Sequence, residues 1–136
     1  MIEVNGPPTT APELRTLAMP ADTNGNGDIF GGWLLAQMDL AGGAYAIRVA
    51  RGRVATVGIE AMSFHRLVLV GDLVSCYCTT VRRGRTSIMV QVETWARRLG
   101  CTGEPPTDIK VTEGMFSFVA LADDGGKRAL PPEAVE

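Results

Sequence analysis

The chain has 136 residues, 46% of them hydrophobic, and a formal net charge of −2 at pH 7. A chain of this length and composition forms one domain with a substantial core. Its charge attracts neither nucleic acid nor an anionic membrane surface. The first residues lack the apolar run of a secretory signal, and no stretch is apolar for the roughly 18 residues that a membrane span needs. We therefore expect no nucleic-acid or membrane partner.

The three cysteines predict reduced thiols rather than a metal site or a disulfide. Cys76 and Cys78 are two residues apart, so on a strand both side chains point to the same face. His65 is the only histidine, which leaves a metal ion too few ligands. The expected compartment is the cytoplasm.

The two ends of the chain are expected to be flexible tails around one domain at residues 13–128. Residues 1–12 and 129–136 are rich in proline and small side chains and offer little to bury. Residues 14–19 alternate weakly and predict a short strand. Residues 20–28 predict a loop, because Asn-Gly occurs twice within four residues.

Residues 32–51 predict a helix, with apolar side chains around most of its circumference. We expect this helix to be buried on nearly all sides. Gly42 and Gly43 lie inside it, and each costs about 1 kcal/mol relative to alanine. Such a thin flank suits the close approach of another backbone.

The remaining residues predict four consecutive strands, connected by a tight turn at residues 83–85 and a proline-containing loop at residues 101–108. Consecutive strands favour an antiparallel sheet, which must wrap around the single helix. The predicted class is α+β. The predicted strands are residues 54–64, 72–83, 86–99 and 109–123.

Asp39 is the one acid of the predicted helix, and it follows a pair of glycines at the helix start. Gly32 and Asp39 are seven residues apart and so share one helix face, about 10 Å apart along the axis. Unpaired amides at a helix start can hold a carbonyl oxygen, while a carboxylate acts as base or nucleophile. The alternative is an acid that only hydrogen-bonds a neighbour. A phosphate-binding loop is excluded, because no Lys-Ser/Thr pair follows the glycines.

Several segments resemble the YciA-type acyl-CoA thioesterases of the hotdog superfamily. They are LRTLAMPADTNGNGDIFGGWLLAQMD, GRVATVGIEAMSF, VGDLVSCY and RGRTS, and the resemblance extends from about residue 14 to 131. It implies a hotdog fold, in which an antiparallel sheet of five or six strands wraps around one long helix. It also implies hydrolysis of acyl-CoA to a free acid and coenzyme A, without a metal or redox cofactor.

By position in these motifs, the resemblance implies that Asp39 is the catalytic acid, acting as general base toward water or as nucleophile through a mixed anhydride. Asn24 is the active-site asparagine, and the amides of Gly31 and Gly32 polarise the thioester carbonyl. Related members carry histidine where this chain has Phe30. The segment containing His65 also departs from the family pattern, since proline usually stands at the position of Leu67.

The basic turn has two interpretations. Arg83, Arg85 and Ser87 can clamp the phosphates of coenzyme A, or they can form an ordinary solvated hairpin. Arg66 and Lys110 are weaker candidates for the same role. His65 as a catalytic base would indicate a dehydratase of the same fold, but it lies outside a dehydratase motif, and a structural role is favoured.

The resemblance also implies assembly. Hotdog domains pair into dimers with a continuous sheet, and YciA-like members assemble further, often into hexamers, here expected as trimers of dimers. The loop with Asn24 would then face the partner's helix, so that each site is shared. The alternatives are a non-catalytic module that binds or senses acyl-CoA and a purely structural domain. Neither requires Asp39. The sequence predicts no acyl chain length and no preference for coenzyme A over acyl carrier protein.

Overall fold

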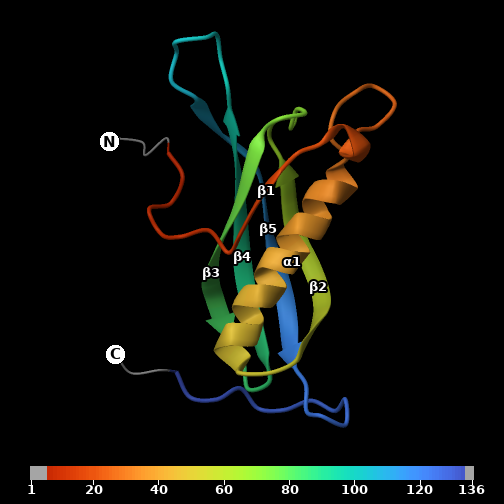
Figure 1. The fold of residues 1–136 in the computed structure, drawn as a ribbon. Helices are drawn as coiled ribbons and strands as arrows, with labels where there is room; N and C mark the ends of the chain where they lie inside the picture. The colour runs from red at the N-terminus through yellow and green to blue at the C-terminus, as the bar shows by residue number, and fades with distance from the viewer. Residues whose placement is uncertain (1–5, 134–136) are drawn as a thin grey trace.

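The computed structural model describes residues 6–133, so the parts of the predicted tails at residues 1–5 and 134–136 lie outside the described residues. Within that range the chain forms one long α-helix, one short 3-10 helix and five strands (Figure 1). In chain order they are β1 (Leu14–Leu17), η1 (Pro20–Asp22), α1 (Gly31–Ala50), β2 (Val54–Phe64), β3 (Leu73–Arg83), β4 (Ser87–Arg98) and β5 (Thr107–Ala120).

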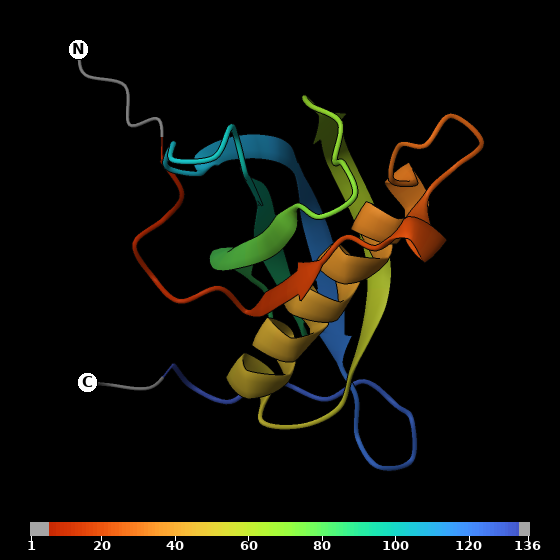
Figure 2. The ribbon, with the colours of Figure 1, turned by 45° about the horizontal axis from the view of Figure 1, so that its top comes forward.

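The five strands form one antiparallel sheet in the order β1-β3-β4-β5-β2. Helix α1 crosses one face of this sheet, and the loop that precedes it lies beyond the sheet end where β2 finishes (Figures 1 and 2). The β3–β4 hairpin lies at the opposite end, near the last turn of α1. The predicted α+β architecture is confirmed.

The core lies between α1 and the sheet. Helix residues Met38, Ala41 and Ala46 are fully buried there against Phe116 and Phe118 of β5. Gly42 packs so closely that a Cβ atom would lie 3.0 Å from the Phe118 ring. The expected close approach therefore occurs, but the neighbour is a side chain of the same subunit.

The expectation that α1 is buried on nearly all sides is wrong for a single chain. Leu40 and Ile47 are 60% and 50% exposed on the helix face that points away from the sheet. An apolar residue pattern predicts that a helix face is buried, but it does not indicate whether the same chain or a partner buries it.

Strand β5 begins inside the predicted loop at residues 101–108. Thr107 and Asp108 pair with Arg98 and Arg97 of β4, so the ladder continues through two residues that the prolines before them had suggested were irregular. Strand propensity is a weak signal where a long neighbouring strand supplies partners.

The described part of the predicted C-terminal tail contacts the domain. Leu130 packs against the core, and its amide donates to the carbonyl of Arg85 at 2.8 Å. Arg128, the last residue of the predicted domain, donates to the carbonyl of Ala50 at 2.8 Å, at the last turn of α1. Among the described residues, no helix has the length and apolar character needed to span a membrane.

Candidate functional site

The start of α1 presents backbone N–H groups that have no partner in the described part of the chain. The amides of Trp33 and Leu34 both donate to the carbonyl of Phe30, and Phe30 has no side chain that can cap the helix. Across residues 6–133, the amides of Gly31 and Gly32 have no acceptor. A Cβ atom at Gly32 would meet nothing within 4 Å. An acceptor atom of a ligand can therefore approach both donors, which carry the positive end of the helix dipole.

The loop before α1 is shaped by Asn24. Its side-chain oxygen accepts hydrogen bonds from the amides of Asn26 at 2.8 Å and Asp28 at 3.2 Å, and its own amide donates to the carbonyl of Asp28. This local pattern is typical of asparagine in turns. In the described part of the chain the side-chain nitrogen of Asn24 has no acceptor, so its two hydrogens remain available.

Asp39 lies in the middle of α1 and is half-buried. Its Oδ1 accepts a 2.7 Å hydrogen bond from the hydroxyl of Thr56 on β2. A donor at this distance orients the carboxylate and leaves Oδ2 for another partner. The sequence did not single out Thr56, which is 17 residues away, although it lies in the segment GRVATVGIEAMSF. Only the crossing of α1 over β2 brings the two side chains together.

Within one chain, Asp39 and the helix start are not close enough to act on one atom. Eight residues separate Gly31 from Asp39, which corresponds to about 12 Å along the axis. In the range that the structure describes, no hydrogen bond joins Asn24 to Asp39. One subunit therefore carries two separated halves of the predicted site.

Arg83, Arg85 and Ser87 lie together at the hairpin end of the sheet. Arg83 donates to the carbonyl of Pro131 and lies 3.7 Å from the carboxylate of Glu133. Arg85 is exposed and Ser87 is half-buried at the start of β4. The predicted basic cluster thus exists, although Arg83 is engaged by the C-terminal segment.

A cavity of about 490 Å³ extends from Arg83 to the last turns of α1 and adds two further arginines, Arg48 and Arg51. Arg48 is held by both carboxylate oxygens of Glu13, at 2.6 and 2.9 Å, and these bonds raise its pKa. Arg51 has no ion-pair partner among residues 6–133. The hairpin end therefore offers positive charge to an anionic group.

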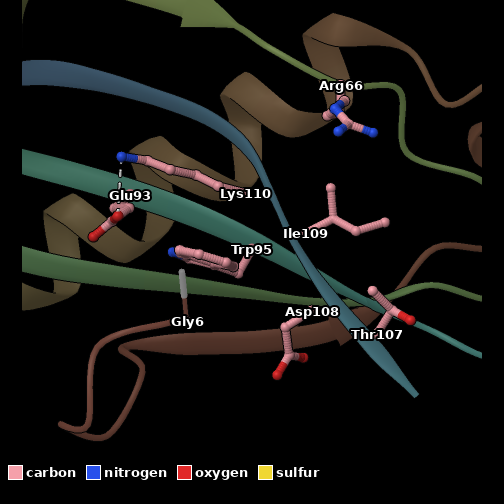
Figure 3. A pocket seen from close by; sticks show the side chains of 8 residues that line it. All are labelled: Gly6, Arg66, Glu93, Trp95, Thr107, Asp108, Ile109 and Lys110. Atoms are coloured by element: carbon pink, nitrogen blue, oxygen red, sulfur yellow. Dashed lines mark ion pairs between the residues drawn. The ribbon is translucent and has the colours of Figure 1, made fainter. Parts of the chain in front are cut away.

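Arg66 and Lys110 lie elsewhere, at a cavity on the sheet face opposite α1 (Figure 3). Lys110 pairs with Trp95, eight residues along β4 from Ser87, which is about 26 Å. Lys110 contacts Glu113 at 2.8 Å and Glu93 at 3.1 Å. Its hydrogen bond to Glu113 raises the pKa of Lys110 and lowers that of the acid. One subunit does not bring Arg66 and Lys110 to the hairpin.

His65 belongs to the same outer cluster of charges. Its Nε2 lies 3.1 Å from a carboxylate oxygen of Glu113, and its side chain is 45% exposed. Its place on the outer face, where Lys110 also contacts Glu113, matches the structural role rather than the dehydratase role.

The cysteines are free thiols. Burial raises the pKa of Cys76 to about 11 and that of Cys78 to about 12, so both stay protonated at neutral pH. Cys101 is exposed in the loop before β5. Among the described residues, no three His, Cys, Asp or Glu side chains are grouped to hold a metal ion.

Comparison with known proteins adds to this geometry. Residues 26–101 match the family model described as the thioesterase superfamily. The acyl-CoA thioester hydrolase YciA of Escherichia coli is 51% identical over 121 residues, which cover 88% of this chain and 90% of that protein. The protein of the same name from Salmonella typhimurium is 53% identical, covering 87% and 88% of the two chains.

Solved structures of similar proteins have the same fold. A hexameric thioesterase of Yersinia pestis has 44% identity and a TM-score of 0.84, covering 93% of this chain and 100% of that one. A hexameric hotdog-fold thioesterase of Campylobacter jejuni has 40% identity and a TM-score of 0.86, with 90% and 91% of the two chains covered.

Proposed function

The chain belongs to the thioesterase superfamily and, within it, to the YciA acyl-CoA thioester hydrolases, and from this premise we propose how its residues act. It is a hotdog-fold enzyme that hydrolyses acyl-CoA thioesters to a free acid and coenzyme A. The observation that carries the residue assignment is the carboxylate of Asp39, held by Thr56 at 2.7 Å on a helix whose first amides have no acceptor among residues 6–133.

Asp39 supplies the acid–base chemistry in this proposal. Oδ1 is held by Thr56, so Oδ2 faces the reaction, where it accepts a proton from water that attacks the thioester carbon. In the second route, Oδ2 itself attacks and forms a mixed anhydride, which water then cleaves. Both routes break the same carbon–sulfur bond and release coenzyme A as a thiol.

The amides of Gly31 and Gly32 stabilise the oxygen that becomes negative during attack. Their N–H groups lie at the N-terminus of α1, which is the positive end of the helix dipole. Within residues 6–133 these hydrogens have no competing acceptor. The side-chain nitrogen of Asn24 is a further donor, which orients the water or the thioester. Its oxygen is used by the loop, so the loop fixes the direction of the amide group.

The protein is a homo-oligomer in which subunits share their sites. The similar proteins of solved structure are hexamers, and we assign this chain a dimer unit and a trimer of dimers. Asn24 and the helix start of one subunit complete a site with the partner's acid, because about 12 Å separates these parts within a chain. Exposed Leu40 and Ile47 on α1, and Val57 beside the unpaired edge of β2, are apolar surface for the partner.

Arg83, Arg85 and Ser87 hold the phosphates of coenzyme A in this assignment. Their cluster and the neighbouring Arg51 carry the positive charge that an anionic nucleotide needs. Arg66 and Lys110 remain predictions for the same role, since within one subunit they lie on the other face of the sheet. The free thiols fit a reducing compartment, and we place the enzyme in the cytoplasm.

The decisive experiment replaces Asp39 with Asn and follows thiol release from acyl-CoA, in a Cys101→Ser background so that the exposed thiol does not react with the reagent. The change keeps the size of the side chain and removes the base, so kcat falls by about 10²- to 10⁴-fold. Asp108→Asn, an exchange of the same type in an ion pair with Arg97, is the control and keeps wild-type kcat. Normal turnover by folded Asp39→Asn protein would refute the assignment.

A further inference from the structure

Strand β2 is irregular at two positions. Its register with β5 shifts between Thr56 and Gly58 and again between Glu60 and Ser63, so Val57 is an extra residue and Ala61 and Met62 together oppose Gly114. At the second bulge Ala61 has φ +53°, a left-handed conformation that costs a non-glycine residue on the order of 1 kcal/mol or more. Bulges redirect side chains to a particular face of a sheet.

The bulges place every third residue of β2 on the face toward α1. The inward, buried residues of β5 in this region are Phe118, Phe116 and Gly114. Thr56 pairs with Phe118 and Ile59 pairs with Phe116. Cross-strand pairs share a face, so Thr56 and Ile59 both face α1. In a regular strand they would point to opposite faces.

Met62 continues this row over Gly114. A Cβ atom on Gly114 would lie 2.1 Å from the sulfur of Met62, so the thioether occupies the space that a side chain at position 114 would fill. Met62 is partly buried and packs against the core cluster that contains Met38 and Phe116. The row Thr56, Ile59, Met62 thus runs from the partner of Asp39 to a flexible side chain in the core. We call it the β2 row.

The β2 row has the right length and polarity for an acyl chain. It begins at a hydroxyl bonded to Asp39 and continues with two apolar residues, of which Ile59 is 40% exposed in one subunit and so is open to contact with a ligand. It spans four residues of β5, from Phe118 to Gly114, which is about 14 Å. An extended chain advances about 1.2 Å per bond, so about twelve carbons reach Met62.

We propose that the β2 row guides the acyl chain of the substrate and that Met62 is the adjustable wall that sets the longest chain accepted. The inference rests on the proposed function, because it places the thioester carbon at Asp39. Methionine suits such a wall, since its unbranched thioether changes rotamer at little cost and fits surfaces of different shape. Gly114 is required because it gives the sulfur a place to rest outside the path of the chain.

The test compares kcat/KM for a sixteen-carbon and a four-carbon acyl-CoA. Met62→Ala removes the wall, so the ratio of kcat/KM for the long substrate to that for the short one rises by about tenfold or more. This is the effect expected when a few methylene groups of the substrate become able to bind in a pocket. Gly114→Ala forces the sulfur from its place and toward the row, so the same ratio falls by about tenfold. The opposite directions separate a wall from a general loss of stability.

Met115→Ala is the matched control. Met115 is the next residue of β5 and points to the opposite face, where it pairs with Glu60 and Gln91. Met115→Ala leaves the ratio of kcat/KM for the two substrates within about twofold of wild type. If the wild-type enzyme is active but Met62→Ala and Gly114→Ala each lower kcat/KM equally for both substrates, Met62 is not a wall that sets chain length. Wild-type protein that cleaves neither substrate would refute the proposed function itself.

Discussion

The start of α1 and its middle carry two halves of the proposed site, and the chain prepares them in opposite ways. At the start, the amides of Gly31 and Gly32 are exposed and have no acceptor in the described chain. In the middle, the carboxylate of Asp39 is half-buried and already held by Thr56. The two amide donors are free to bind the oxygen on which negative charge develops during the reaction, whereas the carboxylate is already oriented by a hydrogen bond.

This difference is the reason for the proposal that two subunits share each site. A reacting carbonyl must touch its donors and its acid at the same time, at about 3 Å from each. The two halves are about 12 Å apart on one rigid helix. In the proposed dimer, a second subunit on the exposed apolar face of α1 would bring a helix start to each acid.

The largest expected effect comes from placing the defects of the two halves in different chains of one dimer. Asn24→Ala and Asp39→Ala proteins, each nearly inactive, regain activity when they are unfolded together and refolded as a mixture. Half of the dimers are then mixed, and each has one intact site of two, so thiol release returns to about a quarter of wild type.

Each variant refolded alone is the control and stays inactive. Proven mixed dimers without recovered activity would show that Asn24 and Asp39 of the same chain act in one site, and the shared site would be wrong.

The second effect concerns how the acid is held. Thr56→Val removes the hydroxyl with little change of volume, so kcat falls by about 10- to 100-fold, the value of a hydrogen bond to a charged group. Thr56→Ser keeps the hydroxyl and retains most of the activity. KM changes little in both variants, because Thr56 acts on the acid. Equal activity of the Val and Ser variants would show that the acid needs no such support.

The smallest effect is expected far from both halves, at the basic hairpin. Replacing Arg83 and Arg85 with Ala raises KM for acyl-CoA by about tenfold and changes kcat less, because such contacts bind the ground and transition states alike.

Arg66→Ala provides the comparison on the opposite face of the sheet. A greater rise in KM for Arg66→Ala than for the hairpin variant would transfer the phosphate site to the outer face, by way of a neighbouring subunit.

Patterns within a short stretch of sequence were predictable. The long helix and the strands follow from the spacing of apolar residues, and the open helix start follows from Gly31 and Gly32. The residues around Asp39 carried enough of the motif to indicate the family, and the family is confirmed by the thioesterase superfamily match. Each of these features depends on neighbours along the chain.

Thr56 and Met62 show what could not be predicted. Both lie in the segment GRVATVGIEAMSF, but its pattern assigned neither of them a role, and a regular strand would have placed Thr56 and Ile59 on opposite faces. The register shifts that turn Thr56 and Ile59 to one face depend on pairing with Phe118 and Phe116 of β5, about 60 residues later in the chain. Lys110 does not lie at the hairpin of its own subunit for a similar reason, because the register of β4 and β5 pairs it with Trp95, about 26 Å along β4 from Ser87.

Residues close together along the chain were sufficient to predict the element order, the acid on the helix and the open amides at its start, because helix and strand patterns and cap chemistry are local. Packing between the elements, in contrast, sets which hydroxyl holds Asp39, which face of β2 lies under α1 and which side of the helix is exposed in one subunit. Those outcomes depend on contacts between residues distant in the chain, where one shift of register reverses the face of a side chain.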